Sequence, residues 1–123
     1  MDLNELTYKI RGCVFEVYNR LGPGLLESVY EKALMYELAY NGIKAKNQCS
    51  VPLVYRGQNL GENLRIDILV EDSVILELKS VEAVLPVHHK QLLSYLKLTG
   101  KKVGLLINFN ESDMAKGIYR LIN

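Results

Sequence analysis

The sequence predicts one α+β domain that spans residues 1–123, with the element order helix, helix, three strands, helix, strand, helix. Two patterns are the basis of this prediction. Apolar residues recur at helical spacing up to Tyr40, and between Leu64 and Lys79 they alternate strictly with other residues, as in half-buried strands. A chain of 123 residues is long enough for a real hydrophobic core and short of the length at which cores divide.

Composition predicts an ordinary soluble globular protein, with 49% hydrophobic and 24% charged residues. The 15 basic and 14 acidic residues give a net charge of +1, so any contact with nucleic acid needs a local patch. Cys13 and Cys49 are too few for a disulfide framework and lack the spacing of metal ligands. Without a signal peptide or an apolar run near 18 residues, the expected location is the cytoplasm, away from membranes.

Two helices are expected at the N-terminal end. The first covers residues 3–21 and ends at the Leu-Gly-Pro-Gly segment, and the second runs from about Leu25 to Tyr40. Glu27 falls in the first turn of the second helix, where the helix dipole favours a carboxylate. The expected apolar faces comprise Leu3, Leu6, Ile10, Val14, Val17 and Leu21, and then Leu26, Val29, Tyr30, Ala33, Leu34 and Leu38.

The remaining elements lie before and after the central hairpin. Residues 48–55 predict a strand, and Pro52 favours an edge position for it. Pro86 suits the first turn of a helix that extends from about 87 to 99 and ends at Gly100. The largely apolar residues 103–109 predict a strand buried on both faces. A last helix is expected from Asn110 or Ser112 to about Ile122, and the buried positions expected of the helix at 87–99 are Leu92, Leu93, Leu96 and Tyr95.

The central hairpin, Leu64–Lys79, has one apolar face and one mixed face. A one-residue slip would set the apolar face of one strand against the mixed face of the other, so only even registers are compatible with the pattern. The simplest register has a loop of residues 71–73 that closes Val70 against Val74. The apolar face then comprises Leu64, Ile66, Ile68, Val70, Val74, Leu76 and Leu78.

The mixed face of this hairpin gathers charge. The same register puts Asp67 directly across from Glu77, and Arg65 across from Lys79. Like charges in directly opposed positions are destabilising, so the two carboxylates favour a cation between them. A solvated polar face that happens to carry charges is the alternative.

The helix at 87–99 has polar residues along one side, because His88, Gln91 and Tyr95 stand at positions i, i+3 and i+7. A lone histidine near a helix start is usually a surface or capping group. Tyr30 and Tyr95, like most tyrosines, are more often core residues than functional ones.

Several of these segments resemble a known family. The stretch Gly24–Tyr30, GLLESVY, fits the motif that names the GxxExxY proteins, and Asp67 followed by Glu77-Leu78-Lys79 resembles the signature of the PD-(D/E)XK nuclease superfamily. Gln91 to Tyr95 has the Q-x-x-x-Y spacing of an exonuclease-like branch of that superfamily. Ile66 stands where the superfamily name expects proline.

This resemblance implies a restriction-endonuclease-like core, in which helices flank a mixed four-stranded sheet and the active site lies on the central hairpin. It further implies a nuclease that hydrolyses the phosphodiester bonds of nucleic acid, with DNA as the expected substrate and Mg²⁺ or Mn²⁺ as the cofactor. The resemblance also favours a site role for Glu27, because an N-terminal helical glutamate commonly reaches the metal in that fold.

The resemblance assigns roles to individual residues. Asp67 and Glu77 are the expected metal ligands, and Lys79 is expected to orient or activate the attacking water. Glu27 is a third or water-bridged ligand, and the carbonyl of Leu78 is a fourth. Gln91 completes the catalytic set, and Tyr30, His88 and Tyr95 support it.

Binding of a polymer is the weaker part of this hypothesis, because phosphate neutralisation supplies most nonspecific affinity for nucleic acid. The expected basic rim consists of Arg65, Lys97, Lys101 and Lys102. A homodimer or a protein partner is another source of binding surface. Two alternatives stay open: a metal-stabilised binding or accessory module without catalysis, and an enzyme for small phosphodiesters.

Overall fold

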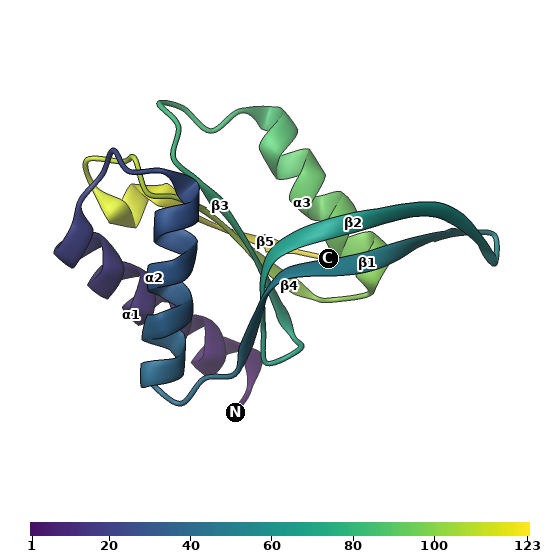
Figure 1. The fold of residues 1–123 in the computed structure, drawn as a ribbon, viewed down its shortest axis with the longest axis horizontal. Coiled ribbons are helices and arrows are strands. Elements are labelled where there is room, and N and C mark those ends of the chain that lie inside the picture. Colours follow the sequence, from purple (N-terminus) through teal and green to yellow (C-terminus); the bar gives the residue numbers. More distant parts are fainter.

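A mixed five-stranded sheet with the strand order β1-β2-β3-β4-β5 forms the centre of the molecule. The computed structural model describes all residues, 1–123. Helices α1 and α2 cover one face of the sheet and α3 covers the other (Figure 1). This arrangement confirms the predicted α+β class. The elements are α1 (Leu3–Leu21), α2 (Glu27–Tyr40), β1 (Ala45–Tyr55), β2 (Gln58–Val70), β3 (Val74–Lys79), α3 (Pro86–Thr99), β4 (Val103–Asn108), the 3₁₀ helix η1 (Met114–Gly117) and β5 (Ile118–Ile122).

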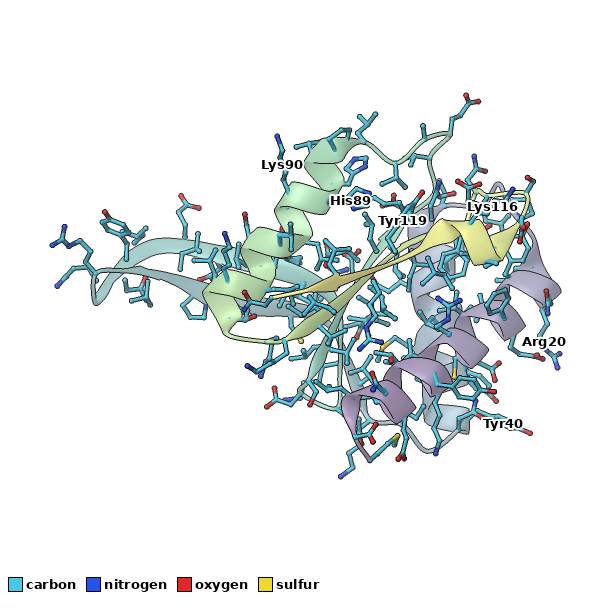
Figure 2. The ribbon with its side chains drawn as sticks, turned by 180° about the vertical axis from the view of Figure 1, so that it is seen from behind. Arg20, Tyr40, His89, Lys90, Lys116 and Tyr119 are labelled. Atoms are coloured by element: carbon cyan, nitrogen blue, oxygen red, sulfur yellow. The ribbon has the colours of Figure 1, made fainter.

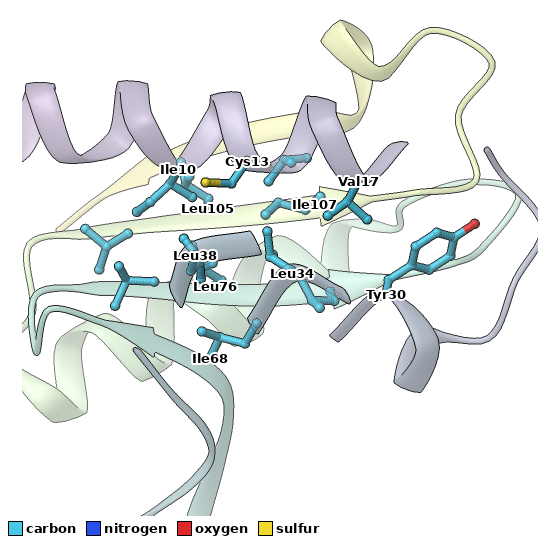
Figure 3. Packing of buried hydrophobic residues seen from close by; sticks show 14 of the residues in the cluster. Ile10, Cys13, Val17, Tyr30, Leu34, Leu38, Ile68, Leu76, Leu105 and Ile107 are labelled. Carbon is cyan, nitrogen blue, oxygen red and sulfur yellow. The ribbon is translucent and has the colours of Figure 1, made fainter. Parts of the chain in front are cut away.

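The larger core lies between the α1–α2 pair and the sheet (Figure 3). Ile10 of α1 and Leu34 of α2 are fully buried there, together with Leu76 of β3 and Leu105 of β4. Each such side chain contributes roughly 1.5–3 kcal/mol by leaving water. Three positions expected on the apolar helix faces are exposed instead, because they lie at or beside the α1–α2 connection, at the margin of this core: Leu21, Leu26 and Val29.

A second, smaller core lies under α3. Leu92 and Leu96 pack there with Ile75 of β3 and Leu106 of β4. Strands β3 and β4 are therefore covered on both faces, as predicted for residues 103–109. Leu93 faces away from this core and is exposed, contrary to the expectation from its apolar character.

The predicted C-terminal helix is wrong. The 3₁₀ helix η1 takes its place, and β5 follows it and pairs antiparallel with β4, so the sheet has five strands where four were expected. The chain passes so close to β4 at Gly117 that an added Cβ would stand 2.6 Å from the carbonyl oxygen of Asn108, and pairing with β4 takes the place of helical hydrogen bonds. After this close approach the chain extends through residues 118–122, which are rich in the β-branched and aromatic side chains that favour strands.

The hairpin register is confirmed at the turn, where Val70 pairs with Val74 across the predicted loop. Pairing of β2 with β3 ends at Ile68 and Leu76, however, and β2 continues as the partner of β1 alone. Arg65 consequently pairs with Ser50, and the prediction that it opposes Lys79 is wrong.

The two faces of β2 exchange where it leaves β3. Ile68 belongs to the larger core, whereas Ile66, expected on the same face, belongs to the core under α3. The change coincides with Gln48 of β1, whose φ of 51° interrupts the extended backbone opposite Asp67. An irregular backbone of this kind increases the local twist, and alternation in sequence does not reveal it.

Cys13 is buried in the larger core and both cysteines are free thiols, in line with the packing role expected for Cys13. Strand β1 lies at an edge of the sheet, as Pro52 predicted. No helix combines the length and apolar character needed to cross a lipid bilayer.

Candidate active site

Asp67 and Glu77 lie just beyond the last backbone pair of β2 and β3, so they are not the directly opposed pair that the register predicted, but their side chains bridge the two strands. The backbone N–H of Asp67 donates to Oε2 of Glu77 at 2.9 Å, and the N–H of Leu78 donates to Oδ2 of Asp67 at 2.8 Å. Each carboxylate thus takes the place of a ladder acceptor on the opposite strand. The second oxygen of each accepts no hydrogen bond from the protein, yet neither is a buried atom without a partner, so both remain accessible to a ligand.

The surroundings of this pair disfavour two negative charges. Burial and, after it, the neighbouring Asp67 charge together raise the pKa of Glu77 to about 8. Burial also raises the pKa of Asp67, whereas the hydrogen bond from Leu78 and the Lys79 ammonium lower it. The pair therefore binds a proton more tightly than free carboxylates do, and a bound cation would relieve the same repulsion.

Glu27 approaches from the start of α2 through contacts with the end of β3. The backbone N–H of Ser80 donates to Oε2 of Glu27 at 3.1 Å, and the Ser80 hydroxyl donates to the carbonyl of Leu25 at 2.6 Å. The hydroxyl of Tyr30 donates to the carbonyl of Gly22 and accepts from the N–H of Leu25, which fixes the α1–α2 connection. No three His, Cys, Asp or Glu side chains lie close enough together to hold an ion directly.

The α3 side of the site is formed by Tyr95. Its ring packs against the core under α3. Burial raises the pKa of its hydroxyl, and the charges of Glu77 and Asp67 raise it as well. Nε2 of Gln91 lies 3.0 Å from the Tyr95 hydroxyl. Nδ1 of His88 accepts the N–H of Leu85 at the start of α3, which is a capping contact.

The sequence matches the PD-(D/E)XK nuclease superfamily over residues 4–121. The chain belongs to the PD-(D/E)XK nuclease superfamily. Its members are nucleases that typically use divalent metal ions. Comparison with curated proteins gives no match.

The four basic residues expected to form a rim do not gather around the candidate site. Nζ of Lys101 pairs with Asp72 at 3.3 Å in the β2–β3 turn, and Lys102 adjoins the start of β4, which lies beside Val74. Both lie at the end of β3 opposite to Lys79, about 16 Å away along the strand. Lys97 is exposed in the last turn of α3. Of the four rim residues, Arg65 is near Asp67 in sequence, on the part of β2 that pairs with β1 alone.

Two polar residues that the sequence analysis did not single out hold segments next to the candidate site. Glu31 of α2 accepts from Asn47 and Gln48 of β1, and its charge raises the pKa of Asp67. Its position one helical turn after Glu27 was the available signal. Asn108 is fully buried, and its amide bonds both the N–H and the carbonyl of Val81, which holds the segment after Lys79. The sequence feature that could have identified Asn108 is that it is the one amide side chain in an otherwise apolar strand.

Proposed function

We propose that this protein is a divalent-metal-dependent nuclease of the GxxExxY group, which hydrolyses phosphodiester bonds in DNA at a site formed by Asp67, Glu77 and Lys79. The carboxylate pair carries this proposal. Two carboxylates are fixed by backbone N–H groups, each keeps one oxygen free, and burial disfavours their joint ionisation. A purely structural polar face has no need for such an arrangement.

The donor set fits Mg²⁺ or Mn²⁺. Mg²⁺ prefers oxygen ligands, keeps several waters and commonly uses one or two carboxylates together with substrate phosphates. Asp67 and Glu77 would supply the carboxylates, with the Leu78 carbonyl as a further oxygen. Glu27, which belongs to no group of three acids, would act through a bridging water. A bound divalent ion would polarise the phosphate and lower the pKa of a water molecule.

The remaining chemistry falls to side chains of this chain. Lys79 stands two residues after Glu77 on β3, so its side chain leaves the same side of the strand. Its ammonium would orient the attacking water and neutralise charge on the phosphate. Gln91, which contacts Tyr95, would support Lys79 or a phosphate oxygen from α3.

A non-catalytic binding module is the second candidate, and the scattered lysines of the expected rim favour it. Turnover separates the two. Incubation of single- and double-stranded DNA and RNA with Mg²⁺ or Mn²⁺ should give cleavage by the wild type and none by Lys79→Ala, while Mn²⁺ binding, measured by calorimetry, is nearly unchanged in the variant. Equal cleavage by both proteins would reject the site, and Mn²⁺ binding without turnover would favour the binding module.

A further inference from the structure

Beyond Asp67, strands β1 and β2 form a two-stranded arm, defined here as residues 49–66. The arm leaves the sheet at the candidate site and projects away from the body of the molecule (Figure 1). We propose that this arm enters the major groove of double-stranded DNA and contacts base edges there, which places duplex DNA in the site at its base. The inference rests on the proposed function for its substrate class.

The dimensions of the arm suit this role. B-form DNA has a major groove about 12 Å wide, which admits a two-stranded β-ribbon, and neighbouring strands lie about 4.8 Å apart. From Asp67 to Gln58, β2 extends about 30 Å at the usual rise per residue. The candidate carboxylates lie at the base of the arm, so a phosphodiester at the edge of the occupied groove would be near them.

One face of the arm carries the chemistry that reads bases. Asn63 and Arg65 pair with Pro52 and Ser50 of β1, and Asn59 pairs with Val54 beyond an irregularity in the ladder. Because the three β1 partners alternate, the three β2 residues share one face. The side chains of these β2 residues are exposed. Amide side chains form paired hydrogen bonds with adenine, and arginine does so with guanine, on their major-groove edges. The opposite face is apolar near its base, where Cys49 and Val51 pack against the core under α3.

The tip of the arm is formed by Arg56 and Gly57. Their φ angles of 50° and 81° belong to the two-residue type I′ turn, whose first position favours asparagine, aspartate or glycine. Arginine in this left-handed conformation is unfavourable for the backbone, and no acidic side chain of the protein pairs with its guanidinium. A residue in a sparsely populated backbone conformation at the tip of the arm points to use of its side chain.

Charge and attachment agree with a DNA ligand. Arg56 and Arg65 against the single acidic residue Glu62 give the 18-residue arm a net charge of +1, which favours contact with phosphates. At the base, Glu31 of α2 accepts from Asn47 and Gln48 at 3.1 and 2.5 Å. These bonds fix the direction of the arm relative to α2. The exposed side chains of Val54, Tyr55 and Leu60 can contact thymine methyl groups.

The test measures binding without cleavage. Anisotropy of a fluorescein-labelled DNA duplex is titrated with the Lys79→Ala protein in Mg²⁺, alone and combined with Arg56→Asn or Arg20→Gln. Arg56→Asn introduces the residue that a type I′ turn favours, so the arm should stay folded. Arg20→Gln removes the same charge from α1, at the end of the molecule opposite to the arm (Figure 2). We expect Arg56→Asn to weaken duplex binding roughly tenfold or more, and Arg20→Gln to leave it unchanged.

A duplex of RNA with the same sequence is the ligand control, because its deep, narrow major groove does not admit side chains. Arg56→Asn should leave RNA affinity unchanged. Equal loss for DNA and RNA, equal loss in both arginine variants, or no loss in either would overturn the inference, as would dimerisation of the protein that depends on Arg56. The result is independent of turnover: wild-type protein that binds duplex DNA through Arg56 and cleaves nothing would reject the proposed function and keep the arm as a DNA-binding element.

Discussion

Glu77 is held in a position where its protonated form is favoured. The backbone N–H of Asp67 fixes its carboxylate, but burial and the Asp67 charge act in the opposite direction and raise its pKa from 4.5 to about 8. In the unfolded chain Glu77 has its ordinary pKa of 4.5. The folded state therefore binds one more proton than the unfolded state between these two values, and this difference is a direct link between the site and the free energy of unfolding.

The first prediction concerns this link. Stability from Glu77 is fully present below pH 4.5 and is lost as the pH rises through about 8, with a slope of at most about 1.4 kcal/mol per pH unit. In chelator, the free energy of unfolding measured in urea should fall between pH 5 and pH 8.5. Glu77→Gln keeps an acceptor for the Asp67 N–H and should flatten this dependence. An unchanged slope in Glu77→Gln would show that another group causes it.

At the scale of elements, the sequence predicts long periodic segments well and short or irregular ones poorly. Helix α1 begins and ends where residues 3–21 predicted, because six apolar positions at regular spacing define one stripe. Strand β5 was mistaken for a helix because its five residues have no strong period of their own and depend on pairing with β4. The exchange of faces at Gln48 was equally hidden, since it is a backbone irregularity.

The candidate site shows the same division. The superfamily signature singled out Asp67, Glu77 and Lys79, and the structure brings Asp67 and Glu77 together, while their roles stay a prediction. The lysines of the rim were misplaced because their positions depend on which end of β4 adjoins the site. That end is set by the parallel pairing of β3 with β4 through α3, which places the lysines just before β4 beside the start of β3, whereas Lys79 stands at its end.

The second prediction tests the close approach that ends η1. Gly117→Ala would bring a Cβ to 2.6 Å from the Asn108 carbonyl oxygen, so it should cost about 1–3 kcal/mol of unfolding free energy. Gly12→Ala is the matched control, because Gly12 lies inside α1 with nothing within 4 Å of the added Cβ. It should stabilise by about 0.5–1 kcal/mol. Urea midpoints of both variants supply the comparison, and similar shifts in both would contradict this account of the β4–η1 contact.

At the scale of the whole molecule, two cores hold the central strands from both sides, while the site lies where β2 leaves this support. Strands β3 and β4 are buried on both faces, so the positions of Glu77 and Lys79 are rigidly set. The carboxylate of Asp67, at the base of the arm, completes the pair. Ligands that bind the pair should therefore stabilise the entire fold.

The third prediction is this linkage. An ion that binds only the folded protein adds about 1.4 kcal/mol at ten times its Kd, which is a rise of about 3–6 °C in Tm for a chain of this size. At pH 8.5, where the proton no longer competes, Mg²⁺ or Mn²⁺ should raise the Tm of the wild type. Asp67→Asn keeps an acceptor for the Leu78 N–H and removes one of two facing charges. It should melt higher than the wild type in chelator and respond little to the ion.

The most direct test of the carboxylate pair as a metal site is thus one pair of melting curves at pH 8.5, wild type and Asp67→Asn, each with chelator and with millimolar Mn²⁺. We predict a rise of several degrees with Mn²⁺ in the wild type alone, and a higher melting temperature of the variant in chelator. A wild-type curve indifferent to Mn²⁺, together with an Asp67→Asn protein no more stable than the wild type, would contradict the account.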